Sequence, residues 1–103
     1  MSGIERIAKE RQRQLEQEGW TPERDDRYLH GDLASAAHCY AQYAGWQSHG
    51  HANFPTPAER PVEWPWVSEW WKPSEDPIRN LEKAGALIAA EIDRLERVRA
   101  RNT

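Results

Sequence analysis

Two short motifs between residues 64 and 73 are rich in tryptophan and proline, and the second also contains a lysine. These residue types at this spacing suit ligand binding. Trp64-Pro65-Trp66 is followed by Trp70-Trp71-Lys72-Pro73. Because proline fixes its φ angle, indoles beside it lose little conformational entropy when a ligand binds between them. Indoles stack on flat groups such as nucleobases, and a neighbouring lysine can pair with a phosphate. The alternative interpretation is that these rings only cover a sparse helical core.

Two further cations lie near the start of a predicted helix. Arg79 and Lys83 are four residues apart, so they share one helix face, where positive charge opposes the helix dipole. Together with Lys72 they form a candidate anion site, since arginine offers the bidentate fork that phosphate accepts. The alternative is that they pair with the nearby acids Glu75, Asp76 and Glu82.

A third group of polar residues raises the possibility of a magnesium site. It comprises Glu10, Gln14, Asp25, Asp26, His30 and Asp32. Carboxylates can bind Mg²⁺ and bridge it to substrate phosphates, as in all-α nucleotide pyrophosphohydrolases. Those enzymes carry paired Glu-x-x-Glu and Glu-x-x-Asp sets, whereas Glu91 and Asp93 are two apart and lie on different helix faces. The alternative is that the aspartates stabilise the N-terminus of the following helix.

Histidine and cysteine give weaker signals. His49-Gly50-His51 with Cys39 and His38 matches the spacing of no zinc finger or zinc ribbon. A nucleophilic Cys39 would need a paired histidine, but adjacent helical residues do not face each other. We therefore predict no catalytic residue, no metal and no cofactor. The predicted ligand-binding residues are Gln14, Trp20, Asp26, His30, Trp64, Trp66, Trp70, Trp71, Lys72, Arg79 and Lys83.

The elements that would position these residues are helical. Ser2 and Glu5 form a capping box that begins a helix at about residues 3–18, and Gly19 ends it. A turn or short 3₁₀ piece follows at 21–26, and a second helix is predicted at about 32–44, ending at Gly45. Residues 46–75 form an irregular Trp/Pro-rich insertion, and Asp76-Pro77 begins a third helix at about 77–99. The sequence predicts one all-α domain, residues 1–103, with three main helices and this long insertion between the second and third.

The third predicted helix carries a heptad-like apolar seam. Its members are Ile78, Leu81, Gly85, Ile88, Ile92 and Leu95. The first helix is poor in large apolar side chains, so the core of a single chain is thin. We therefore expect a homo-oligomer that shares this seam.

Composition excludes several classes of partner. The chain has 103 residues, with 17 acidic against 14 basic side chains and a net charge of −3, so it lacks the positive charge of a nucleic-acid-binding protein. Its longest apolar-rich stretch, residues 84–90, is far shorter than the roughly 20 residues that span a bilayer. A single cysteine rules out an intrachain disulfide. We expect no nucleic-acid or membrane partner and a cytoplasmic location.

Several motifs resemble small uncharacterised proteins encoded by tailed phages and prophages. They are Glu10-Arg11-Gln12-Arg13-Gln14, Glu18-Gly19-Trp20-Thr21-Pro22-Glu23, Asp25-Asp26, His30, Leu33 to Tyr40, Trp64-Pro65-Trp66, Trp70-Trp71-Lys72-Pro73, Arg79 and Lys83 to Leu95. The resemblance implies an accessory protein that acts in the bacterial host cell on host metabolism or defence. Gly19-Trp20, Asp25-Asp26 and His30 are also similar to the repeat domains of ryanodine receptors, but Thr21-Pro22 departs from that pattern.

Three functions are consistent with these features. The first is a phage or prophage accessory protein that binds a small anionic, nucleotide-like ligand without catalysis and counteracts host defence signalling. The second is an inhibitor that binds a host enzyme through exposed aromatic residues. The third is a Mg²⁺-dependent nucleotide pyrophosphohydrolase.

Overall fold

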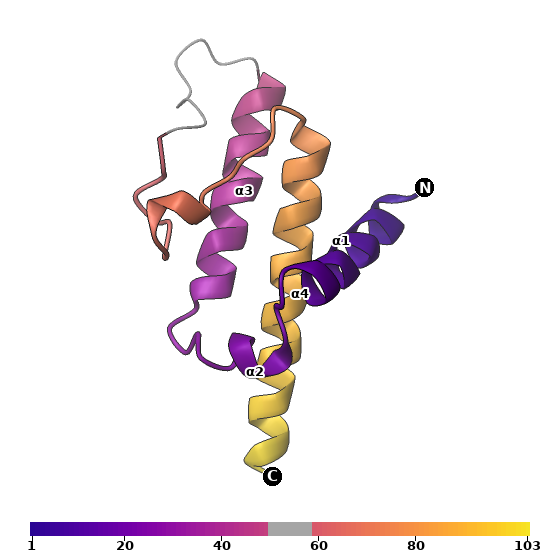
Figure 1. Cartoon of the computed structure of the whole chain (residues 1–103), viewed down its shortest axis with the longest axis vertical. Coiled ribbons are helices and arrows are strands. Elements are labelled where there is room, and N and C mark those ends of the chain that lie inside the picture. Colours follow the sequence, from indigo (N-terminus) through magenta and orange to yellow (C-terminus); the bar gives the residue numbers. More distant parts are fainter. Residues whose placement is uncertain (50–58) are drawn as a thin grey trace.

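The chain folds as an all-α protein, which confirms the predicted class. The computed structural model describes residues 1–49 and 59–103. These ranges contain the helices α1 (Gly3–Gln17), α2 (Pro22–Asp25), α3 (Asp32–His49) and α4 (Pro77–Arg101), one 3₁₀ turn, η1 (Ser68–Trp70), and no strand (Figure 1). None of these helices is both long enough and apolar enough to cross a membrane.

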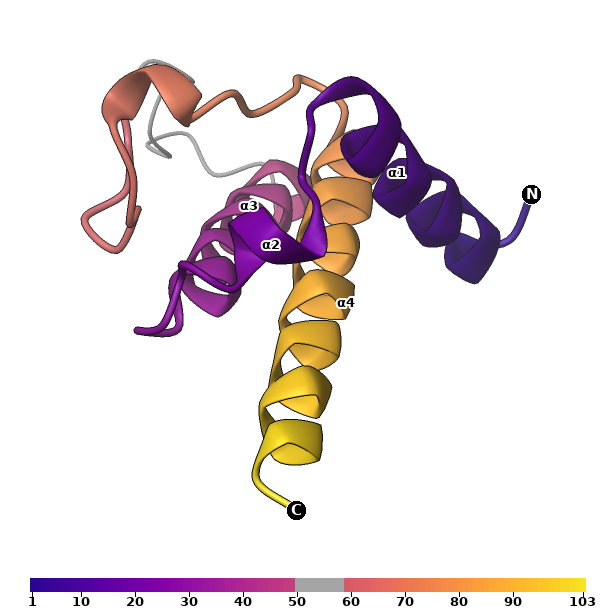
Figure 2. The same ribbon diagram turned by 60° about the horizontal axis from the view of Figure 1, so that its bottom comes forward.

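Helix α4 is the central element. It runs antiparallel to α3 along most of that helix, and α1 crosses it on another side (Figures 1 and 2). Alanines such as Ala36, Ala37, Ala84 and Ala90 are buried between α3 and α4, and their small side chains allow the two backbones to approach. The C-terminal part of α4 projects beyond the other helices, so the molecule is elongated, with extents of 50 × 32 × 23 Å.

Local signals account for most helix ends. The Ser2 amide donates to the Glu5 carboxylate at 3.0 Å, while the Ser2 hydroxyl accepts from the Glu5 amide at 3.2 Å, which is the predicted capping box. Gly19 follows α1 with a φ of +68°, a conformation that glycine adopts without strain. Asp76 caps α4 by accepting from the Ile78 amide.

Two elements differ from their predicted form. Residues 22–25 form one α-helical turn, because the Thr21 hydroxyl accepts from the Arg24 amide and caps it. Helix α3 continues past Gly45 to His49, so residues 46–49, predicted to be irregular, are helical. The extension is held by tertiary contacts: Trp46 packs against the core, and the Gln47 amide donates to the carbonyls of Ser74 and Glu75 at 3.0 Å each.

Asn80 joins the C-terminal end of α3 to the N-terminal end of α4. Its fully buried amide accepts from the Ser74 backbone at 2.7 Å and donates to the Ser74 carbonyl and to the Gln47 side chain, both at 2.8 Å. This network fixes the chain where it enters α4.

The Trp-rich segment, residues 59–76, packs against α3. Trp64 and Trp71 are buried, with ring centroids 5.7 and 4.8 Å from that of Tyr40. The Tyr40 hydroxyl also accepts from the Lys72 amide at 3.3 Å. Gly50 and His51, which belong to the histidine motif considered for zinc, lie outside the described residues.

Candidate functional site: a cavity lined by indoles and cations

A cavity of about 260 Å³ lies between α1, α2, α4 and the Trp-rich segment. Its aromatic wall is formed by Trp20, Tyr40, Trp64, Trp66 and Trp70, and its charged wall by Glu10, Arg13, Glu18, Arg24, Lys72 and Lys83. Gln14 and Leu87 complete the lining. A cavity with one aromatic and one charged wall suits a ligand that has both a flat ring and a charge.

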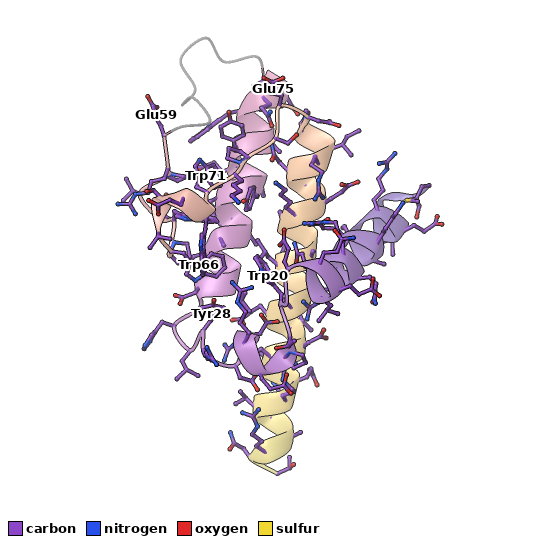
Figure 3. The ribbon with its side chains drawn as sticks, viewed as in Figure 1. Trp20, Tyr28, Glu59, Trp66, Trp71 and Glu75 are labelled. Atoms are coloured by element: carbon purple, nitrogen blue, oxygen red, sulfur yellow. The ribbon has the colours of Figure 1, made fainter. Side chains whose placement is uncertain are left out.

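The aromatic wall is a chain of ring contacts centred on Trp66. The Trp66 centroid lies 6.0 Å from that of Trp20, 5.3 Å from that of Trp64 and 5.9 Å from that of Trp70, all in edge-to-face geometry. Figure 3 shows Trp20 and Trp66 reaching toward each other from separate parts of the chain. Pro65 separates Trp64, which is buried in the core, from Trp66, which is only partly buried; both indoles line the cavity.

Arg24 connects the aromatic wall to the charged one. The capped turn of α2 positions its guanidinium 4.8 Å from the Trp20 ring centroid and 5.3 Å from that of Trp70. Such cation–π contacts hold a charge beside a ring without neutralising it. Arg24 therefore remains available to an anion.

The acids of the cavity are already neutralised. Glu10, whose side chain is 3% exposed, accepts two hydrogen bonds from Arg13 and one from Gln14 at 2.8–2.9 Å, and pairs with Arg79 at 2.7 Å. Burial alone would raise the pKa of Glu10, but the bonds from Arg13, Arg79 and Gln14 and the charge of Arg79 lower it to about 2. Glu18 pairs with Arg13 at 3.0 Å.

Lys83 is the most enclosed cation of the site. Its ammonium donates to the Lys72 carbonyl at 2.7 Å and lies 5.4 Å from the Tyr40 ring centroid. Burial, and then the charge of Arg79, lower the pKa of Lys83, so a bound anion would stabilise its charged form. In residues 1–49 and 59–103, no carboxylate lies within 4.0 Å of the side-chain nitrogens of Arg24, Lys72 or Lys83.

Two buried polar atoms of the lining have no hydrogen-bond partner among the described residues. They are the Gln14 side-chain oxygen, an acceptor, and the Trp66 indole nitrogen, a donor. An unpaired buried polar atom costs about 1–3 kcal/mol.

The structure brings together most of the predicted binding residues. Those that line the cavity are Gln14, Trp20, Trp64, Trp66, Trp70, Lys72 and Lys83. The other four lie outside the cavity. Trp71 is buried against Tyr40 and Tyr43, and Arg79 is paired with Glu10 and Glu82.

Asp26 and His30 also lie away from the cavity. Asp26 pairs with Arg97 and Arg101 of α4 at 2.8 Å each, and His30 is exposed in the turn before α3. The hydrogen bonds from these two arginines lower the pKa of Asp26. Its carboxylate therefore joins the C-terminal end of α2 to the C-terminal part of α4, a pairing that sequence spacing could not predict.

Sequence analysis did not assign Glu10, Arg13, Glu18 or Arg24 to the ligand site. Arg24 had a recognisable signal, because the capping pair Thr21-Pro22 places it one turn after Trp20. The others belong to the regular charge pattern of α1. No local feature distinguishes them from solvent-exposed residues.

The described residues do not assemble a metal site. In residues 1–49 and 59–103, no group of three or more histidines, cysteines, aspartates or glutamates could hold an ion. Asp25 is buried beside Arg11 at 3.4 Å. Burial, and then the charge of Glu63, raise the pKa of Cys39 to about 11, so its sulfur is a protonated thiol at neutral pH and not an activated nucleophile.

Comparisons of the chain with protein-family models, with curated proteins and with solved structures each find no match.

Proposed function

We propose that this protein binds, without catalysis, a small anionic ligand with a flat ring, of the size of a mononucleotide. The observation that carries the proposal is that Arg24, Lys72 and Lys83, none of them paired with a carboxylate in residues 1–49 and 59–103, line the same cavity as several indoles. Cations converging on a partly enclosed space favour an anion. Indoles beside them favour a planar ring.

The cavity also limits the size of the ligand. Its volume of about 260 Å³ is just below the range of roughly 300–1,000 Å³ that is typical of small-molecule pockets. A single base with a phosphate group is therefore the natural occupant. In this arrangement the ring lies against Trp66 and Trp70, the phosphate meets Lys83 and Lys72, and Arg24 bridges the two walls.

Titration with nucleotides tests the proposal. Tryptophan fluorescence and isothermal calorimetry would be followed while purine and pyrimidine mono-, di- and triphosphates and cyclic nucleotides are added. We expect quenching by at least one of them, and a Lys83→Gln variant should bind it at least tenfold more weakly, since a charged hydrogen bond contributes about 1.5–3 kcal/mol. Lys9→Gln, which removes an exposed lysine of α1 outside this cavity, is the matched control and should bind normally.

Two results would contradict the proposal. One is that no nucleotide of the panel changes the fluorescence or releases heat. The other is that Lys83→Gln and Lys9→Gln bind equally well, which would place the anion elsewhere. Circular dichroism of both variants would verify that they are folded.

We further propose that this binding belongs to a phage or prophage accessory protein acting in the bacterial cytoplasm, where capture of a nucleotide-derived signal would blunt a host defence response. The supporting feature is the set of motifs around Glu18-Gly19-Trp20 and Trp70-Trp71-Lys72 that resembles such proteins. Expression in a bacterium that carries a nucleotide-signalling defence system tests this role. Wild-type protein should increase phage yield and Lys83→Gln should not.

A second candidate function, inhibition of a host enzyme by direct contact, is favoured by the outer surface of the Trp-rich segment. Val62 is 97% exposed, and Val67 and Trp70 are each about half exposed. Apolar groups grouped on one segment can act as anchors for a protein partner. Affinity purification from host lysate would then yield one stoichiometric protein, and its recovery would fall with Val67→Asp and not with Lys83→Gln.

A further inference from the structure

An exposed apolar stripe runs along α4. Ile78, Leu81, Ile88, Ile92 and Leu95 are each between 41% and 54% exposed. Soluble monomers rarely expose so many large apolar side chains in one continuous row. The stripe lies outside the cavity described above.

The stripe occupies one side of α4, because the other sides are already covered. Asn80, Ala84 and Leu87 of α4 are buried on the α3 side, while Glu82 and Gly85 meet Arg6 and Ile7 of α1. At 100° per residue, the five apolar side chains fall within an arc of about 100°, and Gly85, which the tip of Ile7 covers, lies inside this arc near its α1 edge. One more helix packed there would complete the surroundings of α4.

We propose that this helix is α4 of a second copy, packed antiparallel across a two-fold axis. The charges at the ends of the stripe support this choice. Glu75 and Asp76, both exposed, lie at its N-terminal end, as Figure 3 shows for Glu75, and Arg99, which is 77% exposed and pairs with Glu96 at 3.4 Å, lies within its arc at the C-terminal end. Antiparallel packing places the acidic end of each copy against the basic end of the other, whereas parallel packing would place like charges together.

The stripe is also long enough and regular enough for such a contact. Its members repeat at intervals of three, four and seven residues, the spacing at which helices interlock side chains. With full overlap, Leu81 of one copy faces Ile92 of the other. A two-fold contact removes the stripe of both copies from water. The total surface area that it buries is on the order of the 1,000 Å² that a specific interface requires.

Molar mass in solution gives the first test. Size-exclusion chromatography with light scattering at about 100 µM should show twice the chain mass of 12.0 kDa. Ile92→Glu should give the monomer mass with an unchanged circular dichroism spectrum, since this side chain is half exposed in the single chain. Val62→Glu, which changes an equally apolar and more exposed side chain off the helix, should leave the dimer intact.

Disulfide trapping tests the orientation. Under mild oxidation, a mixture of the Leu81→Cys and Ile92→Cys variants should form a covalent dimer in high yield, and each variant alone should form little; buried Cys39 is common to all samples. Crosslinking of each variant with itself would show parallel packing and overturn the proposal. A wild-type protein that remains a monomer would overturn it as well, because the stripe would then belong to a different partner.

Discussion

The carboxylate of Glu10 links α1 to α4, and its replacement by glutamine tests how much the charged network of the cavity contributes to stability. Glu10 accepts hydrogen bonds from Arg13 and Gln14 on α1 and pairs with Arg79 on α4. Glu10→Gln keeps the size of the side chain and removes its charge. The guanidinium groups of Arg13 and Arg79 then lose a common partner.

The expected cost follows from the pKa of Glu10. A carboxyl whose pKa falls from 4.5 in the unfolded chain to about 2 in the folded one contributes about 3 kcal/mol at neutral pH. The two arginine side chains are about 30% exposed, so water recovers part of this loss in the variant. We therefore expect Glu10→Gln to lower the free energy of unfolding by about 2–3 kcal/mol, or the Tm by roughly 10–20 °C.

The pH dependence gives an independent check. Because folding lowers the pKa of Glu10, its stabilising contribution is complete above about pH 4.5 and is lost as the pH falls toward 2. Urea unfolding followed by circular dichroism should therefore show a constant difference between wild type and Glu10→Gln at pH 5–7. The two proteins should converge in stability between pH 4.5 and pH 2.

Glu16→Gln is the matched control, because Glu16 is an exposed residue of the same helix that bonds only with Gln12 among the described residues. It should change the free energy of unfolding by no more than about 0.5 kcal/mol. Equal stabilities of Glu10→Gln and Glu16→Gln at pH 7 would refute the assigned role of the network. So would a difference that persists unchanged at pH 2.5.

Three other changes probe the packing. A Cβ at Gly85 would lie 2.5 Å from the tip of Ile7, so Gly85→Ala should lower the free energy of unfolding in urea by about 1–2 kcal/mol despite the better helix propensity of alanine. In a chain that already carries Ile7→Ala, the same substitution should instead raise the free energy of unfolding by up to about 1 kcal/mol. Asn80→Ala removes the partner of the Ser74 backbone N–H and of the Gln47 side-chain oxygen and should lower the unfolding free energy by about 3 kcal/mol; a loss below 1 kcal/mol would argue against the network. Since burial raises the pKa of Cys39 to about 11, iodoacetamide at pH 8 should modify it only in urea, and rapid labelling of the native protein would contradict this burial.

Local sequence determined where most helices begin and end. The capping box of Ser2 and Glu5, the Asp76-Pro77 start and the left-handed Gly19 each involve groups within about four residues of one another, so they are legible without a tertiary structure. The same locality explains the prediction that was wrong at Gly45. A helix-ending signal there was outweighed by distant contacts of Trp46 and Gln47.

The division of similar residues between core and cavity was decided only by the tertiary structure. Trp66 faces the cavity and Trp71 the core, although both belong to one Trp-rich segment. Arg79 and Lys83 share a helix and a charge, yet Glu10 from α1 pairs with Arg79, while Lys83 has no carboxylate partner among the residues that the structure describes. A sequence determines which charges exist, but their pairing depends on which helices pack together, and that packing depends on contacts among residues far apart in the chain.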